Sequence, residues 1–373
     1  MKYMEIEGLV ERDLGYRRIQ CTGRGSYVIS LPKEWVLNLG LEKGSQIAFR
    51  VLEDSSLLLT PRSILEGRRK AEERSLRRYC LVVSAKDDPK SICRKIISLY
   101  VISAELIRVR FREGYSSKFR LPIKNLVKNM LLGSEIIEET PEGMTIQILI
   151  NHPVFPVEKA IRRMAILALS ADRDSIIALK DMDEELIESV IDSCSDVNRL
   201  NLYVLRQLKY YLERNLYKEL GFKTPKEFLG YRIVANNIKS IADNAVNIAR
   251  NVKNLKRLIE GQVLFLKEVL DEEVYSQILE FNNFAHQLFE DSMKALFKRN
   301  YNLADSIISK IEGSIGIEND LTGLISSKRL DPNISSIMRL ILDNSRRIME
   351  YSRDIAEVTL NRSIEEVVIP EAR

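Results

Sequence analysis

Residues 230–250 read GYRIVANNIKSIADNAVNIAR and align without a gap on residues 337–357, which read IMRLILDNSRRIMEYSRDIAE. The aligned pairs Arg232/Arg339, Asn237/Asn344, Ile241/Ile348, Ile248/Ile355 and Ala249/Ala356 are identical. In both stretches apolar residues recur at i, i+3, i+4 and i+7, which is typical of an amphipathic helix. The chain therefore contains an internal repeat built of helices.

The same helical period extends over residues 153–366. It predicts six helices: Pro153–Leu179, Glu184–Asn215, Pro225–Leu255, Leu264–Asn300, Leu303–Ser326 and Asn333–Ile364. Long helices with short connections favour antiparallel bundles. Together with the repeat, they predict an all-α domain over residues 152–366, made of tandem three-helix bundles at about 153–255 and 262–364.

Composition places the whole chain among globular proteins. It has 373 residues, 45% of them hydrophobic and 29% charged, and two to three domains are expected. The longest stretch without a charged side chain, residues 143–157, is too short for a membrane span and contains Pro153 and Pro156. The N-terminus lacks the apolar core of an export signal, and the four cysteines are scattered. We therefore expect a cytoplasmic protein.

Residues 1–62 have the pattern of a small β domain. Strands are predicted at Arg17–Thr22, Tyr27–Leu31, Gln46–Val51 and Leu57–Thr60, with a short helix at Lys33–Leu39. About 60 residues bury a low fraction of their surface, and these strands would have open edges. We therefore expect this domain to form a dimer.

The positive charge is concentrated at the N-terminal end. Residues 1–78 carry the whole net charge of +4, and residues 63–78 form a basic stretch predicted as a linker helix. Such an asymmetry favours a polyanionic partner.

The middle of the chain, residues 79–151, predicts the order β-α-β-α-β-β, which is typical of a small α+β domain. No catalytic motif occurs in it. A spacer and a ligand-sensing domain are both open interpretations.

The run RRIQCTGRGSYVISLPKEWVLNLGLEKGSQIAFRVLEDSSLLLTP, residues 17–61, resembles the swapped-hairpin AbrB/SpoVT/MazE DNA-binding domain. The resemblance implies that two chains interleave into one small β-barrel, and that basic residues of the first strand and nearby loops face double-stranded DNA. Carried over by position, these are Arg17, Arg18 and Arg24, with Arg12 and Lys33 as further candidates. A dimerisation module without DNA binding is the alternative.

In the helical part, SIADNAVNIA (240–249) is similar to the signature helix of PhoU, and RRIMEYSRDIAE (346–357) is a weaker second copy. The resemblance covers about residues 153–362. PhoU-like proteins act in the cytoplasm beside the phosphate ABC transporter and repress phosphate uptake or its genes. An AbrB-like head joined to a PhoU-like body resembles archaeal phosphate-uptake regulators.

The resemblance also implies metal clusters on Glu/Asp-xxx-Asp motifs, from which this sequence departs. Lys239 precedes Asp243 and Arg346 precedes Glu350, so that a cation stands at one ligand position of each copy. We expect i, i+4 salt bridges there and no cofactor. The remaining metal-ligand candidates are weak, namely Asp192, Asp196, Asp243 and Glu350. His286 and Glu290 have ligand spacing but are expected on the surface.

The sequence is compatible with two functions and disfavours a third. The first is a transcriptional regulator of phosphate uptake that binds operator DNA through its N-terminal dimer and senses phosphate status through its helices. The second is an adaptor that contacts the ATPase subunit of a phosphate ABC transporter without binding DNA. An enzyme is disfavoured, because no Walker motif, dinucleotide loop or nucleophile–base pair occurs and the only histidines are His152 and His286. The operator, the sensed signal and any assembly beyond a dimer stay open.

Overall fold

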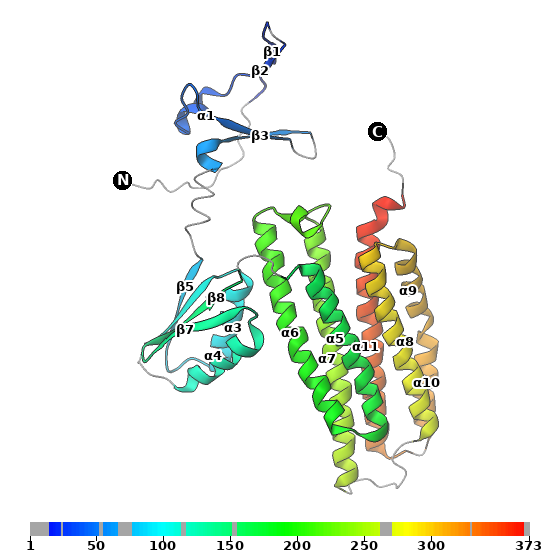
Figure 1. Cartoon of the computed structure of the whole chain (residues 1–373). Coiled ribbons are helices and arrows are strands. Elements are labelled where there is room, and N and C mark those ends of the chain that lie inside the picture. The colour runs from blue at the N-terminus through cyan, green and yellow to red at the C-terminus, as the bar shows by residue number, and fades with distance from the viewer. Residues whose placement is uncertain are drawn as a thin grey trace. The chain divides into compact units, whose positions relative to one another are not determined.

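The computed structural model describes residues 15–23, 25–51, 55–65, 77–112, 117–150, 155–261, 271–328 and 330–368. The chain divides into two compact units, Met1–Leu76 and Arg77–Arg373. Figure 1 labels their helices and strands. Residues 62–65 are helical, and most of the expected linker helix lies outside the described residues.

Unit 1 consists of two hairpins and one short helix. β1 (Gln20–Cys21) pairs antiparallel with β2 (Tyr27–Val28), α1 spans Lys33–Asn38, and β3 (Ile47–Val51) pairs antiparallel with β4 (Leu57–Pro61). In the described part of one chain the two hairpins form separate two-stranded sheets, and the barrel implied by the resemblance would need two chains. β1 and β2 are shorter than predicted, because only two residues of each find a backbone partner in this chain.

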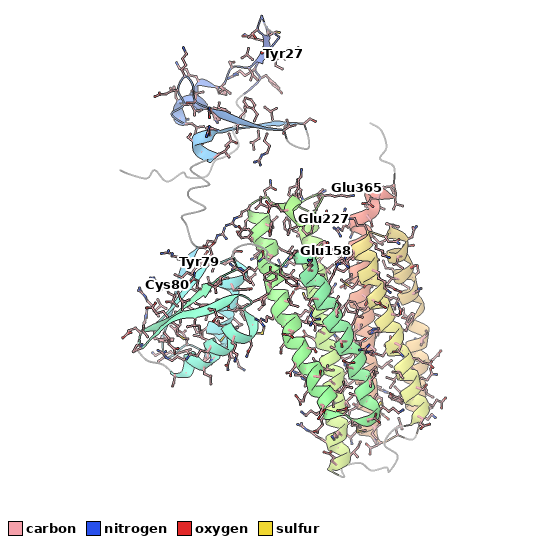
Figure 2. All side chains as sticks on the ribbon, in the orientation of Figure 1. Tyr27, Tyr79, Cys80, Glu158, Glu227 and Glu365 are labelled. Carbon is pink, nitrogen blue, oxygen red and sulfur yellow. The ribbon has the colours of Figure 1, made fainter. Side chains whose placement is uncertain are left out.

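Unit 1 has almost no core of its own. Of its described residues only Pro61 is buried. On β3, Phe49 is 65% and Val51 69% exposed, although both lie on the apolar face of the hairpin. Tyr27, labelled in Figure 2, is likewise exposed on β2. An apolar face of this kind on a small domain calls for a covering partner.

Unit 2 begins with the predicted α+β domain, and its element order is confirmed. The elements are β5 (Arg78–Val83), α3 (Pro89–Val101), β6 (Leu106–Phe111), α4 (Ser117–Met130), β7 (Ser134–Thr140) and β8 (Gly143–Ile148). They form one sheet in the order β5-β6-β8-β7, with β5 parallel to β6 and the other neighbours antiparallel. The buried side chains of the sheet pack with those of α3 and α4 in one hydrophobic cluster.

The helical bundle completes unit 2. Its helices run along one common direction in Figure 1 and comprise α5 (Val157–Asp181), α6 (Glu184–Glu213), α7 (Glu227–Glu260), α8 (Glu272–Lys298), α9 (Tyr301–Gly313), α10 (Ile315–Ser327) and α11 (Pro332–Ser363). Their apolar faces share one core cluster. The first expected repeat corresponds to α5–α7 and the second to α8–α11, and the two share this core.

One helix prediction was wrong. The single helix expected over Leu303–Ser326 is divided into α9 and α10 at Ser314. There the Ser314 hydroxyl and backbone N–H both donate to the Ile311 carbonyl, at 2.7 and 3.1 Å. A side chain that bonds the backbone in this way competes with the helical ladder, and Gly313 beside it lowers helix propensity further.

Buried Arg206 of α6 joins the α+β domain to the bundle. Its Nη1 donates to the carbonyls of Tyr100 and Ala104, at 2.7 and 2.8 Å. Tyr100 is at the end of α3, whose last carbonyls have no partner within the helix. Nearby, Arg77 donates to the Ile102 carbonyl and to Glu213 of α6. The bundle and the α+β domain are therefore linked by charge-assisted hydrogen bonds.

Among the residues described, no helix combines the length and the apolar character that crossing a membrane requires.

Candidate functional site

Three of the basic candidates of unit 1 lie among the described residues. Arg17 and Arg18 are exposed and lie just before β1, with Ile19 between them and the strand, and Arg17 Nη1 donates to the neighbouring Tyr16 carbonyl at 3.0 Å. Lys33 is exposed at the first turn of α1. Arg24 and Arg12 lie outside the described residues. The three described cations are therefore free to meet solvent or a polyanion.

The turn between β1 and β2 is a hairpin turn and opens no helix. Thr22 N donates to the Ser26 carbonyl and Gly25 N to the Thr22 carbonyl, both at 2.9 Å. Gly25 has φ +79°, a conformation that glycine adopts without steric cost. A phosphate-cradling loop would be followed by a long helix, whereas this turn leads into β2.

The second hairpin separates apolar from basic side chains. Ile47, Phe49 and Val51 alternate along β3 with Ala48 and Arg50, and side chains that alternate in a strand point to opposite faces. In the register with β4, Phe49 lies opposite Leu59 and Val51 opposite Leu57. The hairpin thus has one apolar face, which unit 1 leaves uncovered.

In the helical bundle the two copies of the repeat meet between α7 and α11. Asn237 Nδ2 donates to Asp354 Oδ2 at 3.3 Å, and a polar groove of about 370 Å³ lies alongside. Both helices contribute to its lining, which consists of Ser240, Asp243, Asn244, Asn247, Asp343, Asn344, Arg347 and Tyr351. The two helices that carry the repeated sequence therefore lie against each other in the bundle.

The salt bridges expected in each repeat copy are present. Lys239 Nζ lies 2.5 Å from Asp243 Oδ2, and Arg346 pairs with Glu350 while also contacting Asp343 Oδ1 at 2.9 Å. Asp243 Oδ1 also accepts from Cys194 Sγ at 3.3 Å. Burial, together with this carboxylate, raises the pKa of Cys194 to about 12.

The four weak metal candidates are not brought together. Asp192 and Asp196 are exposed on α6, while Asp243 and Glu350 are each occupied by a cation of their own helix. Within the described ranges, no three His, Cys, Asp or Glu side chains are placed to hold one metal ion.

A buried polar cluster links the two bundles and was missed from the sequence. Asp172 of α5 has no exposed surface; its Oδ1 accepts from Asn282 Nδ2 at 3.0 Å and its Oδ2 lies 2.9 Å from His286 Nδ1. Asn282 Nδ2 also donates to Ser345 Oγ of α11. His286 is therefore not the plain surface residue that its spacing to Glu290 suggested. Asp172 follows Ala168 and Ala171 on the core face of α5, a sequence signal that could have revealed it.

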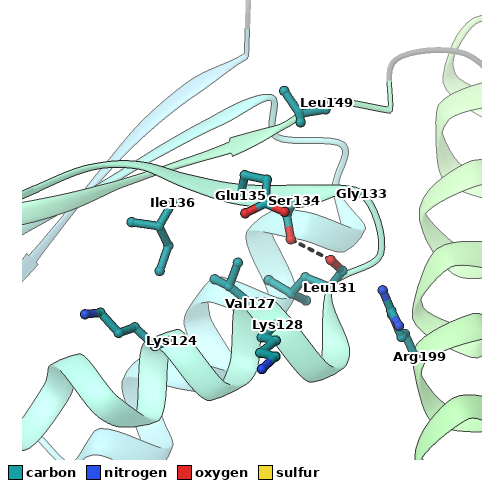
Figure 3. A pocket seen from close by; sticks show the side chains of 10 residues that line it. All are labelled: Lys124, Val127, Lys128, Leu131, Gly133, Ser134, Glu135, Ile136, Leu149 and Arg199. Atoms are coloured by element: carbon teal, nitrogen blue, oxygen red, sulfur yellow. Dashed lines mark hydrogen bonds between the residues drawn. The ribbon is translucent and has the colours of Figure 1, made fainter.

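A further hollow of about 340 Å³ lies where α4 and β7 approach α6 (Figure 3). Lys124, Lys128 and Arg199 contribute cations to it, whereas Glu135 borders it on β7 and alternates with buried Ser134, so that its side chain points to the other face of the sheet. Lys124 is already paired with Glu139 at 2.8 Å; its hydrogen bond, with one from Arg120, lowers the pKa of that carboxyl. The hollow is therefore of mixed charge and does not form a dedicated anion site.

Comparison with known proteins matches two separate parts of the chain. Residues 161–252 match the family model of the PhoU domain, and residues 20–65 match that of the antidote-toxin recognition protein MazE, a bacterial antitoxin. Among solved structures, the phosphate transport system regulatory protein PhoU from Streptococcus pneumoniae is similar. It has 16% identity and a TM-score of 0.46, over 57% of this chain and 96% of that chain. No curated protein matches the chain.

Proposed function

The chain joins an N-terminal MazE-like domain to a PhoU domain, and from this premise we propose that it is a DNA-binding regulator of phosphate uptake. The presence of both domains in one chain carries the proposal. Residues 1–62 bind DNA, residues 63–78 link, residues 79–151 form the α+β domain, and residues 152–366 respond to phosphate status. No step of this function is enzymatic, and it belongs in the cytoplasm.

The proposed DNA-binding form is a dimer. The uncovered apolar face of β3 and β4 supports it, because a second copy would bury Phe49 and Val51. Two copies would also present Arg17, Arg18 and Arg24 twice, related by a two-fold axis. That arrangement suits a pseudo-palindromic operator. Guanidinium groups make bidentate contacts with phosphates and guanine edges.

The helical domain is proposed as the part that receives the signal. The contact between its helices α7 and α11 contains both copies of the repeat. Arg206 connects α6 to the α+β domain. A change in the bundle would reach the α+β domain through that buried contact. The ATPase subunit of a phosphate transporter is a candidate source of the signal.

The test is binding of the purified full chain to DNA upstream of its own gene and of phosphate-transporter genes, over a salt series. We expect tight binding whose affinity falls steeply with salt, because each neutralised phosphate contributes about −0.9 to the slope of log K against log salt. The triple variant Arg17→Ala/Arg18→Ala/Arg24→Ala should lose binding and flatten the slope.

The matched control, Lys159→Ala/Arg163→Ala/Lys180→Ala, removes three exposed cations of α5 and should bind like the unmodified protein. Absence of binding at every salt concentration, from a folded dimer, would refute DNA binding. The adaptor function would then take precedence, with the transporter ATPase as the partner to test.

A further inference from the structure

The α+β domain leaves one face of its sheet uncovered. The inward side chains of the sheet pack on α3 and α4, and both helices in turn contact α6 of the bundle. The opposite face is solvent-exposed along β5 and β6, where Arg78, Cys80, Arg108 and Arg110 are all exposed. Figure 2 labels Cys80 on β5, the edge strand of this face. Among the described residues no helix or strand covers this face.

The register of the strands places opposite charges at opposite sides of this face. One row across the sheet runs Arg78, Leu106, Gln147 and Glu135, and the next runs Cys80, Arg108, Thr145 and Glu138. The cations thus lie on β5 and β6, and the anions lie on β7. The structure shows no ion pair among the described residues for Arg78, Arg108 or Glu135.

The centre of the face is hollowed between these two sides. A depression of about 290 Å³ is lined by residues of β6, β7 and β8, among them Arg108, Arg110 and Glu138. Gly143 on β8 contributes no side chain there, and a Cβ on it would lie 2.2 Å from the Val109 carbonyl oxygen. The face therefore has room for side chains of an opposing surface.

We infer that this sheet face binds the same face of a second copy of the chain, with the two-fold axis parallel to the strands. Rotation about such an axis keeps each row of residues at the same position along the strands and reverses the order of the strands in the second copy. β5 and β6 of one copy then lie over β7 and β8 of the other. Facing sheets pack about 10 Å apart with interdigitating side chains, a distance that arginine spans.

The distribution of charge on this face favours a second copy of the chain as the partner, and a two-fold axis parallel to the strands. A polyanion such as DNA would be repelled by Glu135 and Glu138, whereas a second copy presents cations to those glutamates and glutamates to Arg78 and Arg108. A two-fold axis perpendicular to the strands would place like charges over each other, which costs several kcal/mol. An isologous interface of this kind is self-complementary by construction.

The inference rests on the proposed function only in requiring two copies of the chain. If the N-terminal domain forms a dimer, the covalent link brings two sheet faces together at high effective concentration. The sheet contact would then hold the two α+β domains in one defined arrangement.

The test is a pair of charge-reversed full chains, Arg78→Glu/Arg108→Glu and Glu135→Arg/Glu138→Arg. Each variant alone places like charges over each other in a dimer of its own kind. Mixed together they restore every opposite-charge contact. The two chains are co-expressed with different tags, and their assemblies are weighed by native mass spectrometry.

Random pairing of equal amounts gives as many mixed dimers as self-paired ones. We expect the ratio of mixed to self-paired dimers to exceed that random value by at least about tenfold, because tenfold corresponds to only about 1.4 kcal/mol. A matched pair with reversed charges elsewhere on unit 2, Lys159→Glu/Arg163→Glu with Glu280→Arg/Glu312→Arg, should mix at random. Random mixing of the sheet-face pair, or monomers throughout, would overturn the inference.

Folding is checked by the thermal unfolding of unit 2 in each variant, which should match the unmodified protein because the altered side chains are exposed. If Arg78→Glu/Arg108→Glu fails to fold, Arg110→Glu replaces it, with the same two outcomes. DNA binding is not part of the readout, so failure here and failure of the proposed function are distinguishable.

Discussion

The two units of this chain differ in how far each one buries its own apolar residues. Unit 2 encloses clusters of fully buried side chains in both its α+β domain and its bundle. Unit 1 has the alternating pattern of a folded β domain but leaves that pattern uncovered, with Pro61 as the only buried residue among those described. Unit 2 therefore has a hydrophobic core within one chain, whereas the apolar face of unit 1 would be covered only in the proposed dimer.

The largest expected effect tests the incomplete unit. Phe49→Ala should destabilise the N-terminal domain by about 3–5 kcal/mol, because in the proposed dimer Phe49 is a core residue. Chemical unfolding followed at several protein concentrations measures it, and the unmodified domain should become more stable as concentration rises.

Ile233→Ala on α7 is the control for that substitution, since Ile233 is 46% exposed on a unit that has its own hydrophobic core. Its cost should stay within about 0.5 kcal/mol. If Phe49→Ala is equally mild at all concentrations, the apolar face of β3 is surface and the comparison between the units fails.

The next largest effect is expected in unit 2, at the buried side chain of Arg206. Arg206→Ala should cost about 3 kcal/mol, since it removes a charged donor from the carbonyls of Tyr100 and Ala104, although the Tyr100 carbonyl keeps its bond from the Ser103 N–H. Denaturant unfolding of the full chain, with Arg232→Ala as an exposed control on α7, measures this cost. A loss no greater than the control's would mean that the α+β domain and the bundle are not held together by this residue.

Acid should lower the stability of unit 2 by a smaller amount, because it protonates carboxylates whose pKa the fold lowers. Hydrogen bonds from Arg346 and Arg347, against the effect of burial, hold the pKa of Asp343 below its ordinary 3.8. The Val274 N–H and Lys328 lower the pKa of Asp271 at the start of α8. Groups with lowered pKa stabilise the fold above their unfolded pKa, and this contribution is lost as pH falls through the folded value.

The melting temperature of unit 2 should therefore decline as pH falls below about 4. Asp271→Asn keeps a capping side chain but removes the charge, so it should flatten this decline, with less than about 1 kcal/mol lost at neutral pH. Asp354, whose pKa burial raises, acts in the opposite direction. If the melting temperature of Asp271→Asn falls with acid as steeply as that of the unmodified protein, the Asp271 carboxylate contributes nothing to the stability of unit 2.

The smallest effect is expected at Lys239, which stands where the PhoU resemblance implies a metal-binding carboxylate. Lys239→Met should cost only about 0.3–0.5 kcal/mol, because its pair with Asp243 is half exposed and spans one helical turn. Added Mn²⁺ should leave the melting temperature of the unmodified protein unchanged. A manganese-dependent rise would instead assign a metal to Asp243.

The sequence predicts the local elements well where period and packing agree. Helices of the bundle and the β-α-β-α-β-β order follow from apolar spacing, and the salt bridges Lys239–Asp243 and Arg346–Glu350 follow from residues one helical turn apart. The helix break at Ser314 could not be predicted, because its hydroxyl donates to the Ile311 carbonyl and leaves the apolar period of α9 and α10 intact.

Long-range polar contacts could not be predicted in the same way. Asp172 and His286 are more than a hundred residues apart, and Arg206 meets Tyr100 across two domains. One sequence shows that such a side chain lies on a helix, but not which carbonyl or carboxylate the fold brings to it. The candidate DNA-binding arginines were placed by resemblance, and they remain a prediction.

The most direct measurement is the mass of the full chain in solution by sedimentation equilibrium, from nanomolar to micromolar concentration. A dimer that Phe49→Ala dissociates, while unit 2 keeps its unfolding transition, is the predicted result. A chain that stays monomeric at every concentration, with its N-terminal domain folded cooperatively, would contradict the conclusion that a second copy completes unit 1.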